Sequence, residues 1–252
     1  MASASLDGVR LKIKRAKLHL GNLGRAVKRF RETSAYEIAT EDNPDTGLRE
    51  WRVVRADPLP PSLSLLTGDV VHNLRSALDH LVYQLVLANG NAPNTRSGFP
   101  MWKTKADYEQ NRPGPADGLS TQALATLYGL MLYRSGSPHL WTLHRLDIID
   151  KHRLVLAVAE AHRNTIIDLG PTLEAQGAFG IPPPPVTVVP EQPQPIEAGT
   201  VLLRWAPIDD VDFTFGVALH EPGLVTFEPL LPTLEDLAAA VDATVALFAP
   251  LF

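Results

Sequence analysis

Hydrophobic side chains recur every three or four residues over much of the first two-thirds of the chain, and this spacing predicts long helices. Residues 5–33 show it without a break, in a stripe formed by Leu6, Val9, Ile13, Ala16, Leu20, Leu23, Val27 and Phe30. Such a stripe lets one helix lie along another. We expect it to pack either on the chain's own core or on a second copy, which would give a homodimer through the 5–33 helix.

Helices are also predicted over four later segments, which together with the first form a helical core within about residues 1–165. A proline cluster precedes the first of the four and marks where it begins. The four predicted helices cover about residues 62–88, 105–111, 120–130 and 138–162.

Segments of alternating polar and apolar residues predict strands between the first two helices and again in the C-terminal third. Residues 35–40 and 48–55 are separated by a run of turn-forming residues, which is typical of a hairpin. A proline-rich connector at about 181–195 then leads to a strand-rich C-terminal part, about 196–252. Its predicted strands are 200–205, 212–219 and 224–227, and a last helix begins near Thr233.

Helices dominate the first two-thirds of the pattern and strands the last third, and this order favours an α+β fold over alternating βαβ units. We therefore expect one domain over residues 1–252, with a helical core of long helices, an N-terminal hairpin and a small antiparallel sheet in the C-terminal third.

The predicted 62–88 helix carries an unusual kind of polar face. Leucine and valine fill one half of its helical wheel, and the other half contains neither lysine nor glutamate, the usual residues of a solvated face. Polar side chains of defined shape favour a face that lines a pocket or contacts another polar element. These side chains are His72, Asn73, Arg75, Ser76, Asp79, His80, Tyr83 and Gln84.

The predicted 138–162 helix supplies an opposite wall. Its apolar residues point in nearly every direction, which is typical of a buried helix, so its charges must be paired or face a cavity. Asp147 and Lys151 are spaced for a pair at i,i+4. The polar residues of the two helices therefore form either a functional site or a salt-bridged core.

One hypothesis for such a site is metal-independent cleavage of RNA. The spacing from Arg75 to His80 resembles the Arg-x4–6-His motif of the HEPN family, and the spacing from Arg145 to His152 fits the same pattern. The resemblance implies an arginine that binds the scissile phosphate and a histidine that takes part in acid–base attack by the ribose 2′-hydroxyl, in a site typically assembled across a dimer. Histidine and arginine suit these roles by their titration range and their planar fork. The candidate catalytic residues are His72, Arg75, Asp79, His80, Arg145 and His152.

A second hypothesis is a divalent transition metal held between the same two helices. Histidine nitrogens and carboxylate oxygens are suitable ligands for such an ion. The candidate metal ligands are His72, His80, His144, Asp147 and Asp150. Under the first hypothesis we expect no cofactor.

A third hypothesis is a non-catalytic interaction or regulatory protein. The strings HNLRSALDHL and LHRLDIIDKHRL are similar to those of an uncharacterised bacterial family that pairs such segments in this order. This resemblance supports treating the two helices as one unit and implies no activity.

Composition and charge exclude several other kinds of chemistry and indicate where the protein acts and what it could bind. The chain has no cysteine, which excludes disulfides and thiolate chemistry, and it lacks the glycine-rich motifs of nucleotide-binding proteins. No secretory signal or membrane-spanning run is present, so we expect a cytoplasmic protein with no membrane partner. Residues 1–31 carry nine basic side chains against one acid, although the net charge of the chain is −5. This basic segment is either a solvated face that pairs with the acidic remainder or a surface for an anionic partner such as RNA.

Overall fold

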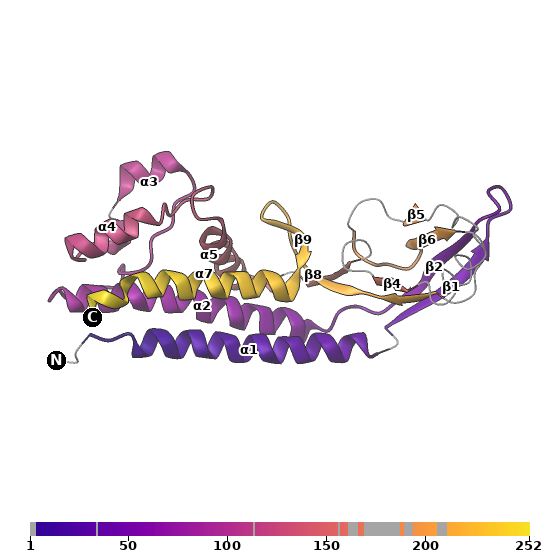
Figure 1. Ribbon diagram of the computed structural model, residues 1–252, viewed down its shortest axis with the longest axis horizontal. Helices are drawn as coiled ribbons and strands as arrows, with labels where there is room; N and C mark the ends of the chain where they lie inside the picture. The colour runs from indigo at the N-terminus through magenta and orange to yellow at the C-terminus, as the bar shows by residue number, and fades with distance from the viewer. Residues whose placement is uncertain are drawn as a thin grey trace, which may run out of the picture. The chain divides into compact units, whose positions relative to one another are not determined.

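The computed structural model describes residues 4–33, 35–112, 114–155, 157–160, 166–168, 187–188, 194–205 and 211–252 (Figure 1). Its helices are α1 (Asp7–Arg31), α2 (Pro61–Ala88), α3 (Lys105–Asn111), α4 (Thr121–Gly129), α5 (Pro138–Asp150) and α7 (Leu230–Phe248). Its strands are β1 (Tyr36–Asp42), β2 (Arg49–Ala56), β3 (Ala157–Glu160), β4 (Ile166–Asp168), β5 (Thr187–Val188), β6 (Val201–Trp205), β7 (Asp212–Thr214), β8 (Gly216–Glu221) and β9 (Val225–Pro229). The predicted α+β fold is confirmed. Most of the predicted proline-rich connector lies outside the described residues.

The chain divides into two compact units, each built from separate stretches of sequence. Unit 1 contains Met1–Gly24, Ser64–Val155 and Leu231–Phe252, and unit 2 contains Arg25–Leu63 and Leu156–Leu230. The helical unit therefore takes α7 from the C-terminal third, which the sequence pattern had grouped with the strands.

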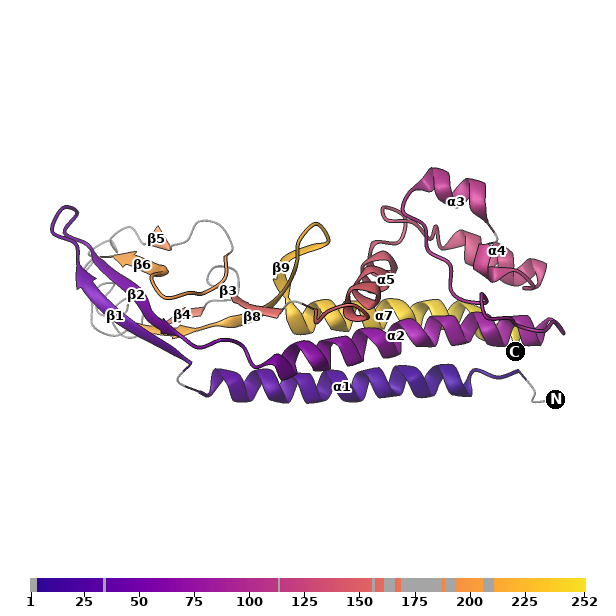
Figure 2. The ribbon, with the colours of Figure 1, turned by 180° about the vertical axis from the view of Figure 1, so that it is seen from behind.

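In unit 1, helices α1, α2 and α7 run side by side (Figures 1 and 2). The predicted apolar stripe of α1 is the surface that it buries, and Val9, Ile13 and Leu23 are each at most 5% exposed. Burial of each large aliphatic side chain stabilises the fold by about 1.5–3 kcal/mol. Because the chain's own core covers this stripe, a homodimer through α1 would need the opposite, exposed face of the helix.

The predicted helix over 138–162 is correct only in its first half, since α5 ends at Asp150. Residues 151–154 are all exposed, whereas a helix that is apolar on every side would stay buried. The helix therefore does not continue over them. The chain then re-enters the core at Val155 and forms β3, which pairs with β8.

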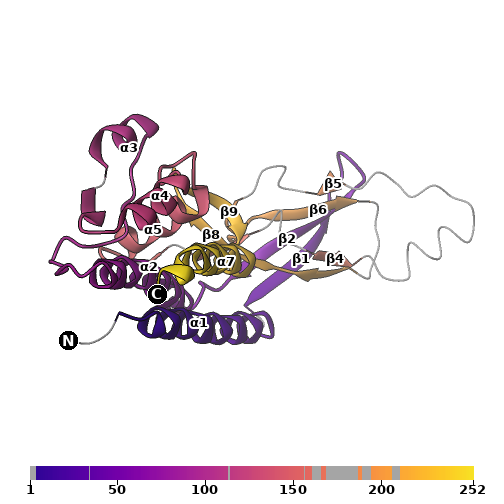
Figure 3. The ribbon, with the colours of Figure 1, turned by 60° about the vertical axis from the view of Figure 1, so that its left-hand side comes forward.

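In unit 2, the predicted N-terminal hairpin is confirmed, with β1 antiparallel to β2. The hairpin does not stand alone, because β2 also pairs with β6, and the resulting sheet has the order β1-β2-β6-β5 (Figure 3). A second sheet has the order β3-β8-β9, and β4 pairs with β7. Glu50 of β2 is buried and accepts hydrogen bonds from Arg52 and Arg204, which ties β6 to the hairpin.

Of the helices that the structure describes, none combines the length and the hydropathy that crossing a membrane requires.

Candidate functional site

Helices α2 and α5 face each other, as their polar residues predicted (Figure 2). His72 of α2 lies 3.2 Å from Asp147 of α5, measured from Nδ1 to Oδ1. One turn earlier on α2, Gly68 lies against the carboxylate of Asp150. The two helices therefore contact each other through polar side chains at these two positions.

A single buried carboxylate organises this face. The side chain of Asp147 is 3% exposed, and its two oxygens bind different partners. One oxygen contacts His72, whose side chain is 54% exposed, and the other accepts a hydrogen bond of 2.6 Å from Lys151 Nζ. Asp147 thus holds an open imidazole and an open ammonium group beside each other.

The contact with Asp147 also fixes where the His72 ring carries its proton. An ionised carboxylate only accepts hydrogen bonds, so Nδ1 of the ring must be the donor. In the neutral ring Nε2 is then the nitrogen with a free lone pair. A carboxylate behind a histidine selects the tautomer in this way in hydrolase triads.

Arg75 of the same helix is more buried than His72, and its Nη2 has partners, whereas its Nη1 is buried without a hydrogen-bond partner among the described residues. Its guanidinium forms an ion pair of 3.0 Å with Asp79 and donates to the carbonyl of Phe99 at 2.7 Å. Asp79 in turn accepts a hydrogen bond from the backbone N–H of Phe99. Burial lowers the pKa of Arg75, against the opposing effect of Asp79 and Asp147. This group pins the segment around Phe99 to α2.

His144 is a partly buried histidine of the cluster. Burial, followed by the positive charge of Arg75, lowers its pKa to about 4. At neutral pH its ring is therefore neutral. Its Nδ1 is buried and has no hydrogen-bond partner in the described part of the chain.

Asp150 adds a second carboxyl group beside Asp147. Burial, and then the negative charge of Asp147, raises the pKa of Asp150. It can lie there because position 68 is glycine, since a Cβ on Gly68 would sit 2.0 Å from Asp150 Oδ1. Nothing in the sequence pattern had singled out Gly68.

His80 belongs to a different surface of α2. Its ring lies 3.1 Å from the position that a Cβ on Gly8 of α1 would occupy, so it packs against α1. Arg75 instead contacts Asp79 and Phe99. The two residues of the first Arg-x4-His spacing are therefore placed in separate environments.

The two residues of the second spacing, Arg145 and His152, lie on opposite sides of the C-terminal end of α5. Arg145 lies over the ring of Trp141, with its guanidinium carbon 5.9 Å from the ring centre. His152 lies beyond the end of the helix and is exposed, next to Lys151 in the chain. The structure therefore brings together His72, Arg75, His144, Asp147, Asp150 and Lys151, whereas His80 lies elsewhere.

Among the residues that the structure describes, no group of three or more histidine, aspartate or glutamate side chains is arranged to hold a metal ion. Comparisons with models of protein families, with curated proteins and with solved structures found no match to this chain. The geometry of the site therefore carries the functional argument by itself.

Proposed function

We propose that the chain is a metal-independent ribonuclease whose working group is His72, held by Asp147. The observation that carries this proposal is the contrast in exposure within the pair. A buried carboxylate orients an imidazole that is itself open to a substrate, which is the arrangement a general base needs.

In the proposed reaction, Nε2 of His72 accepts the proton of a ribose 2′-hydroxyl. The 2′-oxygen forms a bond to the neighbouring phosphorus, and the bond from phosphorus to the 5′-oxygen breaks. The leaving oxygen takes a proton from an acid, a role that suits the exposed His152. The products are a 2′,3′-cyclic phosphate and a 5′-hydroxyl.

Lys151 supports phosphate binding in this scheme. Its ammonium group lies on the same carboxylate as His72 and is more than half exposed. A positive charge beside the base stabilises the charge that develops on the phosphate oxygens. Arg75 is a positioning residue in this scheme, because its side chain is largely buried and its Nη2 is held by Asp79 and the carbonyl of Phe99.

The residues of the proposed site thus differ from a direct transfer of the HEPN motif. His72 replaces His80 as the base, since His80 packs against α1. The proposal also includes a cytoplasmic location, where RNA substrates occur.

The test is cleavage of a fluorogenic RNA oligonucleotide in EDTA. Relative to the wild type, His72→Gln and Asp147→Asn should each lower the rate by about 100-fold or more, because they remove the base or its orientation. Lys151→Ala should weaken cleavage by about tenfold or more, through the lost charge on the phosphate.

His139→Gln is the matched control, since His139 is an exposed histidine at the start of α5. It should cleave at the wild-type rate, and an oligonucleotide without 2′-hydroxyl groups should resist cleavage. Melting temperatures identify any variant that fails to fold. Undiminished cleavage by folded His72→Gln protein would refute the proposal.

A further inference from the structure

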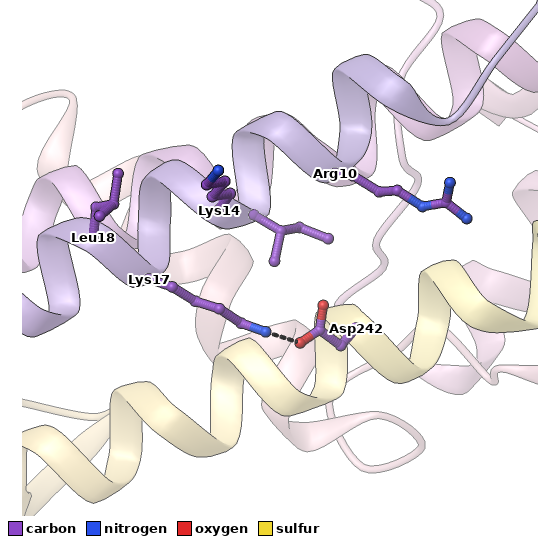
Figure 4. A pocket seen from close by; sticks show the side chains of 6 residues that line it. Arg10, Lys14, Lys17, Leu18 and Asp242 are labelled. Atoms are coloured by element: carbon purple, nitrogen blue, oxygen red, sulfur yellow. Dashed lines mark hydrogen bonds and ion pairs between the residues drawn. The ribbon is translucent and has the colours of Figure 1, made fainter.

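A groove of about 360 Å³ runs between α1 and α7 in unit 1 (Figure 4). It lies on elements that the proposed ribonuclease site does not use. Three of its lining residues are cations, all of them on α1. The lining residues are Arg10, Ile13, Lys14, Lys17, Leu18 and Asp242.

The cations of this groove are only partly neutralised. Lys17 forms an ion pair of 2.5 Å with Asp242 across the two helices, as Figure 4 shows. Arg10 and Lys14 are exposed, and within the described residues neither has an ion-pair partner. The sequence led us to expect that acidic residues elsewhere in the chain could neutralise this basic face. In the described residues they do so for Lys17 but not for Arg10 and Lys14. Two unpaired cations beside one paired cation favour an anionic partner.

Large apolar side chains accompany these cations. Leu11 is 65% exposed and Leu18 is 55% exposed, and they lie seven residues apart on α1. Seven residues are close to two helical turns, so the two leucines project from one side of the helix. Ile13 is buried at the bottom of the groove. Leu18 lines the groove and Leu11 lies beside it on α1, so the surface repeats an apolar contact at the heptad spacing that a second helix would match.

We propose that this groove docks an acidic amphipathic helix of a partner protein. The leucines would pack against the apolar stripe of that helix, and Arg10 and Lys14 would pair with carboxylates beside the stripe. A nucleic acid backbone would use the cations but leave the leucines unburied. A membrane would need a broad apolar face, and that face of α1 is already buried in the core.

The proposal is tested by fluorescence anisotropy on the full chain. The probe is a labelled three-heptad peptide with leucine at the a and d positions and glutamate at the e and g positions. We expect saturable binding with a Kd of about 10 μM or tighter. Lys14→Glu and Leu18→Ser should each weaken it by about tenfold or more.

Lys12→Glu is the matched control for Lys14→Glu. Lys12 lies on the same helix, two residues earlier and about 100° or more around it from Leu11 and Leu18, and it does not line the groove, so the same substitution changes the net charge equally away from the docking surface. Peptide binding should be nearly unchanged in Lys12→Glu. His72→Gln should bind the peptide normally, which separates this inference from the ribonuclease proposal.

Four results would overturn the inference. The first is the absence of saturable peptide binding, and the second is an equal loss in Lys14→Glu and Lys12→Glu, which marks non-specific charge attraction. The third is displacement of the peptide by polyuridine RNA or phosphatidylserine vesicles with the same dependence on Lys14. The fourth is a dimer in sedimentation that Lys14→Glu dissociates, because the occupant would then be a second copy of this chain.

Discussion

Asp147 joins the residues of the candidate site, because its two oxygens bind His72 and Lys151 separately. The carboxylate is buried, so it gains from both contacts in an environment where charge is costly to leave unpaired. Removing either partner leaves the other in place but with a less neutralised carboxylate behind it. The geometry at the surface thus depends on a residue that a substrate would not touch.

The lowered pKa of His144 predicts how the folding stability changes with pH. Its pKa in the folded chain is about 4, below the ordinary 6.5, so only the unfolded chain takes up this proton between those values. Folding stability should therefore fall as the pH drops from 6.5 towards 4. With allowance for solvent screening of a half-buried ring, the loss at pH 5 is about 1 kcal/mol.

His144→Phe should remove this part of the acid sensitivity. Urea unfolding at pH 7 and pH 5 measures it, and the variant should lose about 1 kcal/mol less than the wild type between the two. Asp150 acts in the opposite direction, since its pKa is raised, but it is present in both proteins. Exposed His139→Phe provides the control. Equal losses in the wild type and His144→Phe would show that the ring is not buried as described.

At the scale of elements, the close approach of α2 and α5 depends on Gly68. A Cβ there would overlap the carboxylate of Asp150 and displace it. Gly68→Ala should therefore destabilise the wild type by about 1–2 kcal/mol, although alanine is the better helix former.

The effect of Gly68→Ala on the free energy of unfolding should change sign in a protein that lacks the carboxylate of Asp150. In an Asp150→Ala background, Gly68→Ala should stabilise the protein by about 0.5–1 kcal/mol, because only the helix propensity remains. Gly24→Ala is the matched control within α1, since its added Cβ meets only Leu231 at 3.9 Å and should stabilise both backgrounds. Thermal or urea unfolding measures all of these. Stabilisation by Gly68→Ala in the wild type would contradict the contact.

The sequence pattern predicted the facing of α2 and α5 correctly but placed the end of α5 too late, and both results have physical reasons. The facing of α2 and α5 followed from polar residues that a solvated helix rarely carries, and the contact between His72 and Asp147 confirms it. The end of α5 was misplaced because Val155 and the residues after it continue an apolar run that suits a helix or a strand equally. Pairing with β8, distant in sequence, selects the strand.

At the scale of the whole molecule, the α+β class could be predicted because helical and alternating patterns occupy different parts of the chain. The joining of the N-terminal hairpin to β6 could not, since it pairs residues about 150 positions apart, such as Trp51 and Leu203. Local patterns do not specify such partners. The same limit applies to the site, because the separation of Arg75 from His80 depends on the loop at Phe99 and on α1.

Unit 1 thus has two separate surfaces for which we propose different functions. The α2–α5 face holds the exposed His72 against the buried Asp147, and the α1–α7 groove is lined by the exposed Arg10, Lys14 and Leu18. Substitutions at His72 and at Lys14 therefore act on separate surfaces.

The chemistry of the cleaved RNA ends reports directly on the role of His72. RNA incubated with the protein in EDTA should yield 2′,3′-cyclic phosphate and 5′-hydroxyl termini by mass spectrometry, about 100-fold more slowly with His72→Gln. These termini require the 2′-hydroxyl to act as the nucleophile and a base to accept its proton. Intact RNA with the wild-type protein would show that the chain is not a ribonuclease, and the same termini at the same rate with His72→Gln would show that His72 is not the base.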